Sequence, residues 1–407
     1  MRVLIVTPPM VQLNAPYAAG PQLAGFLGEQ GVDAVQADVS LSLALELFSH
    51  HGVESILGDI RKRRRAGRSL SPSVRHFLAH ADRYAATVEA AIRFLQGRDP
   101  ALGRKISGRR FLPEGPRFAV LEQIPLLASM NRPDTAKYLA SLYIDDLADV
   151  IRDGVDPRFE LSRYGEKLAV SAPSFEPIRR ALEAQPTLVD RCLDRLADEL
   201  LAKHRPGLVG FTVPFPGNLY GALRLARRIK RKHPSVPVAL GGGYVNTELR
   251  DLKEPRLFDY VDYVTLDAGE APLLALVEHV QGRRPSENLC RTFVRRRGTV
   301  VFVDAPSPGG GALDGAGVPA YDGLELDRYV SLCEMPNPMH RLWSDGRWNK
   351  LMLAHGCYWR KCAFCDTSLD YIRRYHAESA DALVDRIEAV IAATGSRAFH
   401  FVDEAAP

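Results

Sequence analysis

Strand-like apolar runs alternate with helical patterns near the start of the chain and again after residue 207, and this alternation limits the possible folds most. Residues 2–9 (RVLIVTPP) are typical of a buried strand, because four large aliphatic residues precede a Thr-Pro-Pro break. A helical pattern that ends near Gly31 and a second strand at residues 32–40 follow. Strands joined through helices pair in parallel, so the sequence predicts an α/β fold.

Three more strands are predicted in the second stretch of alternation, at residues 207–213 (GLVGFTV), 236–243 (VPVALGGG) and 261–270 (VDYVTLDAGE). The helix between the first two spans residues 218–233, with Asn218 as its expected N-cap. Its apolar residues fall on one face: Leu219, Ala222, Leu223, Ala226 and Ile229. Five such strands predict a doubly wound parallel sheet, for which we expect the order 2-1-3-4-5.

The remaining segments have different patterns, and together they predict four regions. Helical patterns replace the alternation between the two halves of the sheet, which indicates a helical insertion. A β-hairpin at residues 291–304, with its turn at an Arg-Gly pair, precedes a linker rich in glycine and proline. The predicted regions are 1–48 with 200–285 (sheet domain), 49–199 (helical insertion), 286–349 (hairpin and linker) and 350–407 (strand, cysteine loop, helix and strand).

Composition excludes several classes of protein. The 407 residues carry a net charge of only +4, and the two short basic runs, 61–65 and 295–297, contain no aromatic residues for base stacking. No run approaches the roughly 20 apolar residues of a membrane-spanning helix, and the N-terminus lacks the pattern of a signal peptide. We therefore expect a cytoplasmic protein with no nucleic-acid or membrane partner.

The residues that end the predicted strands are candidates for a ligand site. Ligands of open parallel sheets bind at the carboxyl ends of the strands. Three successive glycines there would let a bulky ligand approach the backbone, although glycine-rich turns occur in many such sheets. The chain has neither a GxGxxG nor a Walker motif at these positions, so the ligand class stays open. The candidates are Thr212, Gly241, Gly242, Gly243, Gly269 and Glu270.

Three of the six cysteines lie within nine residues, in the sequence HGCYWRKCAFCDTS. Cys357, Cys362 and Cys365 follow a predicted strand and precede a helix. In a reducing compartment such a cluster suggests metal rather than disulfides, and thiolates suit zinc or an iron–sulfur cluster. A structural zinc site needs four ligands, and the candidates for the fourth are Asp366, His355 and His376. Three cysteines on a [4Fe-4S] cluster would instead leave one iron open. Cys192, within a helical pattern, is expected to be a small buried hydrophobe.

This cysteine loop resembles that of the radical S-adenosylmethionine (SAM) superfamily, with one residue more in the first gap than the commonest spacing. Its GCYWRKCAFC form is similar to a subset with a preceding cobalamin-binding domain, and residues 1–48 and 200–285 resemble such domains. The resemblance covers roughly 1–48 and 200–407. It implies a Rossmann-like, B12-binding type of domain, interrupted by the helical insertion and followed by the start of a radical SAM partial (β/α) barrel.

The resemblance also implies cofactors and residue roles. Cys357, Cys362 and Cys365 would bind a [4Fe-4S] cluster, whose open iron would hold SAM for reductive cleavage to a 5′-deoxyadenosyl radical. Phe364 would lie near the adenine, and Asp403 or Glu404 would receive the SAM ammonium group. The six strand-end candidates, Thr212 to Glu270, would line the corrin of cobalamin. However, TPPMVQLNAP replaces the Asp-x-His-x-x-Gly motif that supplies a lower cobalt ligand in many cobalamin proteins.

In such a protein the reaction would be methyl transfer or modification of a carbon skeleton. The substrate would be a small molecule or a peptide, and flavodoxin or ferredoxin would supply electrons. Of the roughly six strand–helix units of a radical SAM barrel, residues 350–407 provide one unit and a second strand. Since two parallel strands bury little surface, we expect them to dock on the first domain, to pair with a separate chain, or to belong to a truncated barrel. A non-catalytic cobalamin- or cluster-binding module and a zinc-stapled scaffold remain alternatives.

Overall fold

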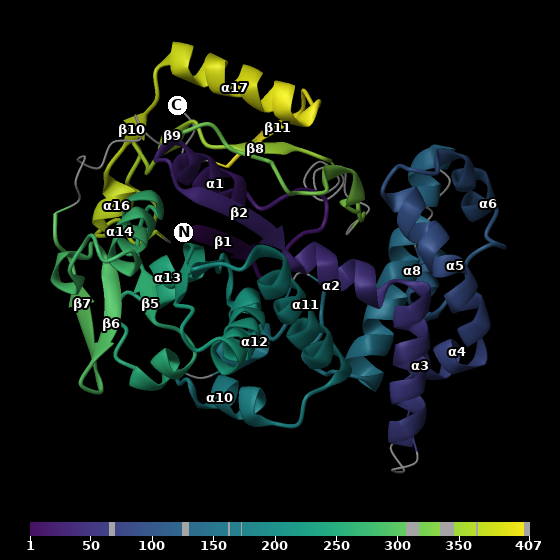
Figure 1. The fold of residues 1–407 in the computed structure, drawn as a ribbon. Helices are drawn as coiled ribbons and strands as arrows, with labels where there is room; N and C mark the ends of the chain where they lie inside the picture. Colours follow the sequence, from purple (N-terminus) through teal and green to yellow (C-terminus); the bar gives the residue numbers. More distant parts are fainter. Residues whose placement is uncertain are drawn as a thin grey trace.

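The computed structural model describes residues 1–64, 70–123, 130–161, 163–171, 173–306, 317–333, 346–363 and 365–402. In this part of the chain a central sheet has the order β2-β1-β3-β4-β5-β6-β7, and its first five strands run parallel (Figure 1). The strands are β1 (Arg2–Thr7), β2 (Asp33–Asp38), β3 (Leu208–Thr212), β4 (Val238–Gly241), β5 (Tyr263–Thr265), β6 (Thr292–Arg296) and β7 (Thr299–Val303). The expected order 2-1-3-4-5 is confirmed.

The predicted hairpin is β6 and β7, and it extends the same sheet antiparallel beyond β5. Its turn lies at Arg297 and Gly298, as expected, and both residues have positive φ angles, of 49° and 82°. Two residues with φ above zero are the signature of the tight turns whose twist matches that of paired strands. The sequence predicted the hairpin but not its addition to the sheet.

Both faces of the sheet are covered, which explains the uninterrupted apolar run in β1. Val3 and Ile5 belong to the core beneath α1 (Ala19–Glu29) and α14 (Glu270–Val280). Leu4 and Val6 point the other way, toward α11 (Leu188–His204) and α12 (Pro216–Lys232). Successive residues of a strand face opposite sides, so a strand buried on both faces has no polar position. The α1 helix ends as predicted, with Gly31 at a φ of 71°.

The predicted apolar face of α12 is buried, but the prediction of Asn218 as its N-cap was wrong. The helix begins at Pro216, which places Asn218 inside the first turn. Its fully buried side-chain amide donates hydrogen bonds to the carbonyl oxygens of Pro8 and Met10, at 3.3 and 2.9 Å. These carbonyls follow β1, so Asn218 fastens α12 to the turn at the end of the central strand instead of capping its own helix.

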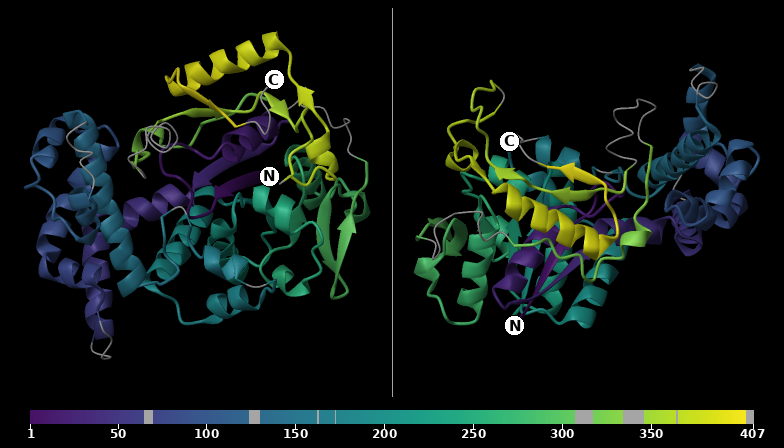
Figure 2. Two further views of the ribbon diagram at one scale, coloured as in Figure 1. Left: turned by 180° about the vertical axis from the view of Figure 1, so that it is seen from behind. Right: turned by 90° about the horizontal axis from the view of Figure 1, so that it is seen from above.

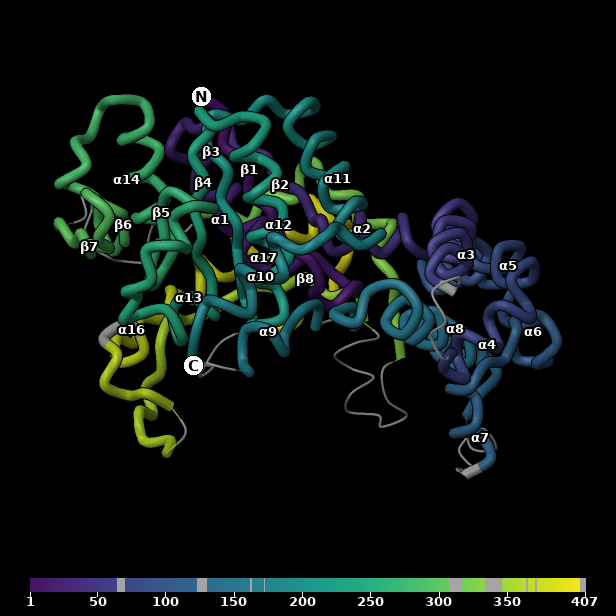
Figure 3. Tube along the Cα trace, turned by 90° about the horizontal axis from the view of Figure 1, so that it is seen from below, coloured from purple at the N-terminus to yellow at the C-terminus, as the bar shows by residue number. Residues whose placement is uncertain are grey.

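The expected helices follow β2 and pack beside the sheet, where α3 to α6 and α8 form a separate group (Figures 1 and 3). Those before α11 are α2 (Val39–Leu47), α3 (His50–Arg64), α4 (Pro72–Ala79), α5 (Ala81–Leu95), α6 (Gly103–Ser107), α7 (Val120–Gln123), α8 (Arg132–Gly154), α9 (Glu166–Val170) and α10 (Glu176–Glu183). The expected boundary at residue 199 falls inside α11. Ion pairs of Asp194 with Arg224 and of Asp198 with Arg228 join α11 to α12 of the sheet domain.

The C-terminal unit contains more elements than the strand, cysteine loop, helix and strand that the sequence predicted. The strand expected at 350–356 is divided into β8 (Asn349–Leu351) and β9 (Ala354–His355), because each half has a different partner. β8 pairs in parallel with β11 (Phe399–Phe401), whereas β9 pairs antiparallel with β10 (His376–Ala377). The remaining helices of this unit are α16 (Asp370–Arg373) and α17 (Ala380–Thr394).

This C-terminal unit docks on the sheet domain, in accordance with one of the three expectations for it. Figure 2 shows α17 and its two flanking strands lying beside the N-terminal half of the sheet. Arg386 of α17 donates a hydrogen bond to Gln22 Oε1 of α1 at 3.1 Å. The side-chain amide of Asn14, after β1, donates to the carbonyl oxygen of Gly346, in the linker three residues before β8, at 2.7 Å. Among the described residues, no helix is long and apolar enough to cross a membrane.

Candidate functional site

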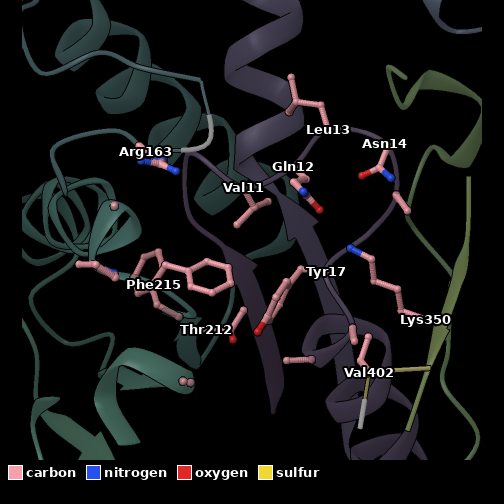
Figure 4. Close-up of a pocket in the computed structure, with 18 of the residues that line it drawn as sticks. Val11, Gln12, Leu13, Asn14, Tyr17, Arg163, Thr212, Phe215, Lys350 and Val402 are labelled. Carbon is pink, nitrogen blue, oxygen red and sulfur yellow. The ribbon is translucent and has the colours of Figure 1, made fainter. Parts of the chain in front are cut away.

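A cavity of about 1300 Å³ lies at the carboxyl ends of the parallel strands (Figure 4). All six strand-end candidates from the sequence line it, from Thr212 at the end of β3 to Glu270 at the start of α14. Parallel strands end at one edge of a sheet, which is why residues almost sixty positions apart in the chain meet here. The cavity exceeds the roughly 300–1,000 Å³ of pockets for drug-sized molecules. It therefore has room for a large ligand, or for two smaller ones side by side.

The glycine run at the end of β4 has a structural reason that the sequence did not reveal. A Cβ atom on Gly242 would lie 2.7 Å from the backbone nitrogen of Val213, and one on Gly243 would lie 2.9 Å from the carbonyl oxygen of Pro214. Gly242 also has a φ of 108°, in a region that is nearly restricted to glycine. The turns after β3 and β4 thus touch through their backbones and are joined by a hydrogen bond from Tyr244 N–H to the Val213 oxygen at 3.0 Å. Close packing of the protein on itself requires these glycines, whether or not a ligand binds.

Thr212 is the strand-end candidate that points most directly to a ligand. Its residue is only 4% exposed, and its hydroxyl has no hydrogen-bond partner among the described residues. Figure 4 shows Thr212 beside the side chains of Tyr17 and Phe215, which also line the cavity. Burying a hydroxyl without a partner costs free energy, so a ligand with a polar group at this position would remove the cost.

The segment after β1 forms a second wall, which was not among the candidates predicted from the sequence. Gln12, Asn14 and Tyr17 all line the cavity, and Figure 4 shows them on the loop that enters α1. Burial raises the pKa of Tyr17 to about 12, so its phenol stays protonated and can donate a hydrogen bond. The rule that ligands meet strand ends applies equally to β1 and could have indicated this segment.

The helical region forms a third wall. One face of α8 borders the cavity, through Ser141, Asp145, Ala148, Asp149 and Arg152. Asp149 forms ion pairs with Arg152, at 2.7 Å, and with Arg117, at 2.5 Å. The spacing of these residues is that of a helix face, but no sequence pattern indicates that this face turns toward the sheet.

The C-terminal unit covers the cavity from above. Lys350 and Met352 reach it from the β8 segment, and His400 and Val402 reach it from the β11 segment. Residues two apart on a strand share a face, and Lys350 and His400 are direct neighbours across the strand pair. Burial lowers the pKa values of both Lys350 and His400. Basic side chains thus face the sheet from the covering unit, and neither of them was predicted from the sequence to belong to the site.

The three clustered cysteines lie beside this cavity and do not line it. Cys357 and Cys362 are half-buried and Cys365 is exposed, whereas Cys192, Cys290 and Cys333 are buried in the core. The loop starts at the rim of the cavity, because His355, two residues before Cys357, is one of its lining residues. The backbone N–H of Cys357 donates to the carbonyl oxygen of Ile372 at 3.0 Å, which fixes the start of the loop.

Accessible thiols on one loop are the right donors for an iron–sulfur cluster, but the structure does not gather them. Within the described ranges, no three His, Cys, Asp or Glu side chains are arranged to hold a metal ion. The loop would therefore have to rearrange around a cluster, as metal-binding loops that fold with their metal do. Phe364, Asp403 and Glu404, the residues expected near SAM, lie outside the described residues.

The comparisons with known proteins give one match in sequence. No protein-family model matches the chain. Over 225 residues it is 24% identical to the uncharacterized methyltransferase PH0819 of Pyrococcus horikoshii, a match that covers 53% of this chain and 45% of that protein. The chain thus spans about half the length of this curated relative.

Two solved structures are similar in part. One is the radical SAM methyltransferase TsrM from Kitasatospora setae, with tryptophan substrate and a SAM analogue bound. It is 20% identical to this chain, with a TM-score of 0.36, and the match covers 52% of this chain and 39% of TsrM. The other is the cobalamin-dependent SAM radical enzyme OxsB, which is 14% identical at the same TM-score of 0.36; that match covers 52% of this chain and 27% of OxsB.

Proposed function

We propose that this chain is the cofactor-binding part of a cobalamin-dependent radical SAM enzyme that carries out methyl transfer. Cys357, Cys362 and Cys365 bind the [4Fe-4S] cluster in this proposal, and SAM binds at the same loop with Phe364 and with Asp403 or Glu404. The corrin of cobalamin occupies the cavity, against Thr212 and the turn at Gly241 to Gly243. Flavodoxin or ferredoxin supplies electrons, and the substrate is a small molecule or a peptide.

The observation that carries the proposal is the position of the cysteine loop at the rim of a large cavity. His355 lines the cavity, and the loop begins two residues later. A cofactor in the cavity and a cluster on the loop would thus be neighbours, as a reaction that uses both requires. The sequence match to PH0819, named a methyltransferase, supports methyl transfer rather than rearrangement of a carbon skeleton.

The residues of the chain have defined tasks in this proposal. When bound and reduced, the cluster supplies the electron that cleaves SAM. The unpartnered hydroxyl of Thr212 donates a hydrogen bond to the cofactor in the cavity, and the protonated phenol of Tyr17 offers a second donor. The segment after β1 contains no histidine that could bind cobalt, and its residues Gln12, Leu13 and Asn14 line the cavity and would contact a corrin held there.

Anaerobic reconstitution with iron and sulfide tests the cluster. We expect about four irons and four sulfides per chain, and broad absorption near 400 nm that is lost on oxidation. Cys362→Ala should lower the iron content and abolish reductive cleavage of SAM. Cys192→Ala is the matched control, because this buried cysteine lies in α11, away from the loop. Stoichiometric zinc without colour would refute the cluster and favour the zinc-stapled scaffold.

Cobalamin binding is tested separately, by gel filtration of the protein with hydroxocobalamin. Co-elution at one corrinoid per chain is expected, and Thr212→Val, which removes the hydroxyl at nearly constant volume, should weaken it. A protein that binds the cluster but no corrinoid would refute the cobalamin assignment alone. Binding of both cofactors without SAM cleavage would identify a non-catalytic binding module.

A further inference from the structure

Lys350 is a charged side chain of the cavity that neither the strand-end rule nor the cysteine loop explains. It comes from β8, the short strand that covers the cavity, and Figure 4 shows its ammonium group directed inward, toward the loop that carries Asn14 and Tyr17. The side chain is half-buried and forms no hydrogen bond or ion pair with any other described residue. The protein thus places a positive charge at the inner surface of a large cavity without a direct partner for it.

Asp38 is the acidic residue whose charge influences the pKa of Lys350, but its carboxylate already has hydrogen-bond partners. Its carboxylate accepts hydrogen bonds from the backbone N–H of Leu41 at 2.9 Å and from the hydroxyl of Tyr329 at 2.8 Å. Asp38 favours the charged form of Lys350 at longer range, but burial outweighs this effect and lowers the pKa of the lysine. The neighbour across the strand pair, His400, is a second basic group and adds no negative charge.

Burying a charged ammonium group costs free energy unless an anion lies beside it. Removing an ammonium group from water disfavours the charged form, and a carboxylate or phosphate oxygen within hydrogen-bonding distance offsets that cost. On the cavity wall opposite the covering unit, Thr212 has an unpartnered hydroxyl. A ligand could therefore form polar contacts with Lys350 on one side and with Thr212 on the other. Asp149, an acidic residue of the α8 wall, is already paired with Arg117 and Arg152.

We propose that Lys350 binds an anionic oxygen group, a phosphate or a carboxylate, of the ligand that occupies the cavity. The proposal deepens the proposed function and rests on it for the identity of the ligand. Two sources share this chemistry. Cobalamin carries one phosphodiester, in its nucleotide loop, and a substrate carboxylate is the other source. In either case Lys350 is a specificity-determining residue that the C-terminal unit contributes to a site built mainly by the sheet domain.

Binding of hydroxocobalamin and of cobinamide, which lacks the nucleotide loop and its phosphodiester, separates the two sources. If the phosphodiester is the group, Lys350→Met should weaken cobalamin binding about 10- to 100-fold and leave cobinamide binding unchanged. Lys350→Arg should retain most of the affinity. Lys253→Met is the matched control, because Lys253 is exposed and does not line the cavity.

The substrate as source is tested by the melting temperature in inorganic phosphate and in acetate, with and without cobalamin. If the group belongs to the substrate, these anions should raise the melting temperature of the wild-type protein and of Lys350→Arg, but not that of Lys350→Met. A wild-type protein that binds no corrinoid but shows this lysine-dependent shift would refute the cobalamin assignment and retain the role of Lys350. Equal corrinoid binding together with equal anion shifts in wild type and Lys350→Met would overturn the inference.

Discussion

Substitution of Gly242 by alanine tests whether the glycine run after β4 serves the fold. Two costs add at this position. A residue other than glycine at a φ of 108° and a ψ of −179° is strained by about 1–3 kcal/mol. The new Cβ would lie 2.7–2.9 Å from three backbone atoms of Val213, and overpacking of this kind costs about another 1–3 kcal/mol. Gly242→Ala should therefore lower the free energy of unfolding by about 2–6 kcal/mol.

Two further glycines separate these costs. Gly282 also has a positive φ, of 75°, but nothing lies within 4 Å of its Cβ position, so Gly282→Ala should cost only about 1–2 kcal/mol. Gly58 lies within α3 with open space around it, and Gly58→Ala should stabilise the protein by about 0.5–1 kcal/mol. Urea denaturation of the three variants without any ligand provides the measurement. Equal effects of the substitutions at Gly242 and Gly282 would refute the steric argument and leave ligand approach as the reason for the glycine.

Two predictions concern buried polar groups. Burial raises the pKa of Asp146 to about 6, so between about pH 4 and pH 6 the folded state holds a proton that the unfolded chain releases. The free energy of unfolding should thus fall as the pH rises through this window, by about 3 kcal/mol relative to Asp146→Asn; a constant difference between the two proteins from about pH 4 to 7 would contradict this. Tyr220, fully buried, donates a hydrogen bond to Asp190 Oδ1 at 2.8 Å. Tyr220→Phe should therefore cost about 1–3 kcal/mol in urea denaturation, and an unchanged midpoint would show that the bond contributes nothing.

Local patterns predicted much of the sheet domain, because burial on both faces leaves a clear trace in the sequence. The apolar run of β1 reflects burial of both of its faces, and the helical spacing of apolar residues in α12 reflects burial of the face that they form. The strand-end rule also brought Thr212 and Glu270 together correctly, since it depends only on the direction of parallel strands. Asn218 was assigned wrongly because a cap and a buried tertiary donor have the same residue type, and only the position of the β1 turn distinguishes them.

The sequence by itself determined the type and order of the elements in the sheet, because their periodicity records which faces are buried. It also determined the three thiols of the cysteine loop, on which the proposed iron–sulfur cluster depends. Only the tertiary structure decided that α8 and the β8–β11 pair would enclose the cavity, and that Lys350 would face its interior. The residues of these walls are up to hundreds of positions apart in the sequence. The periodicity of a helix or a strand shows that one face is buried, but not which element packs against that face. The structure likewise traced the glycines after β4 to contact with Val213, since a close approach of two turns is a property of the assembled fold.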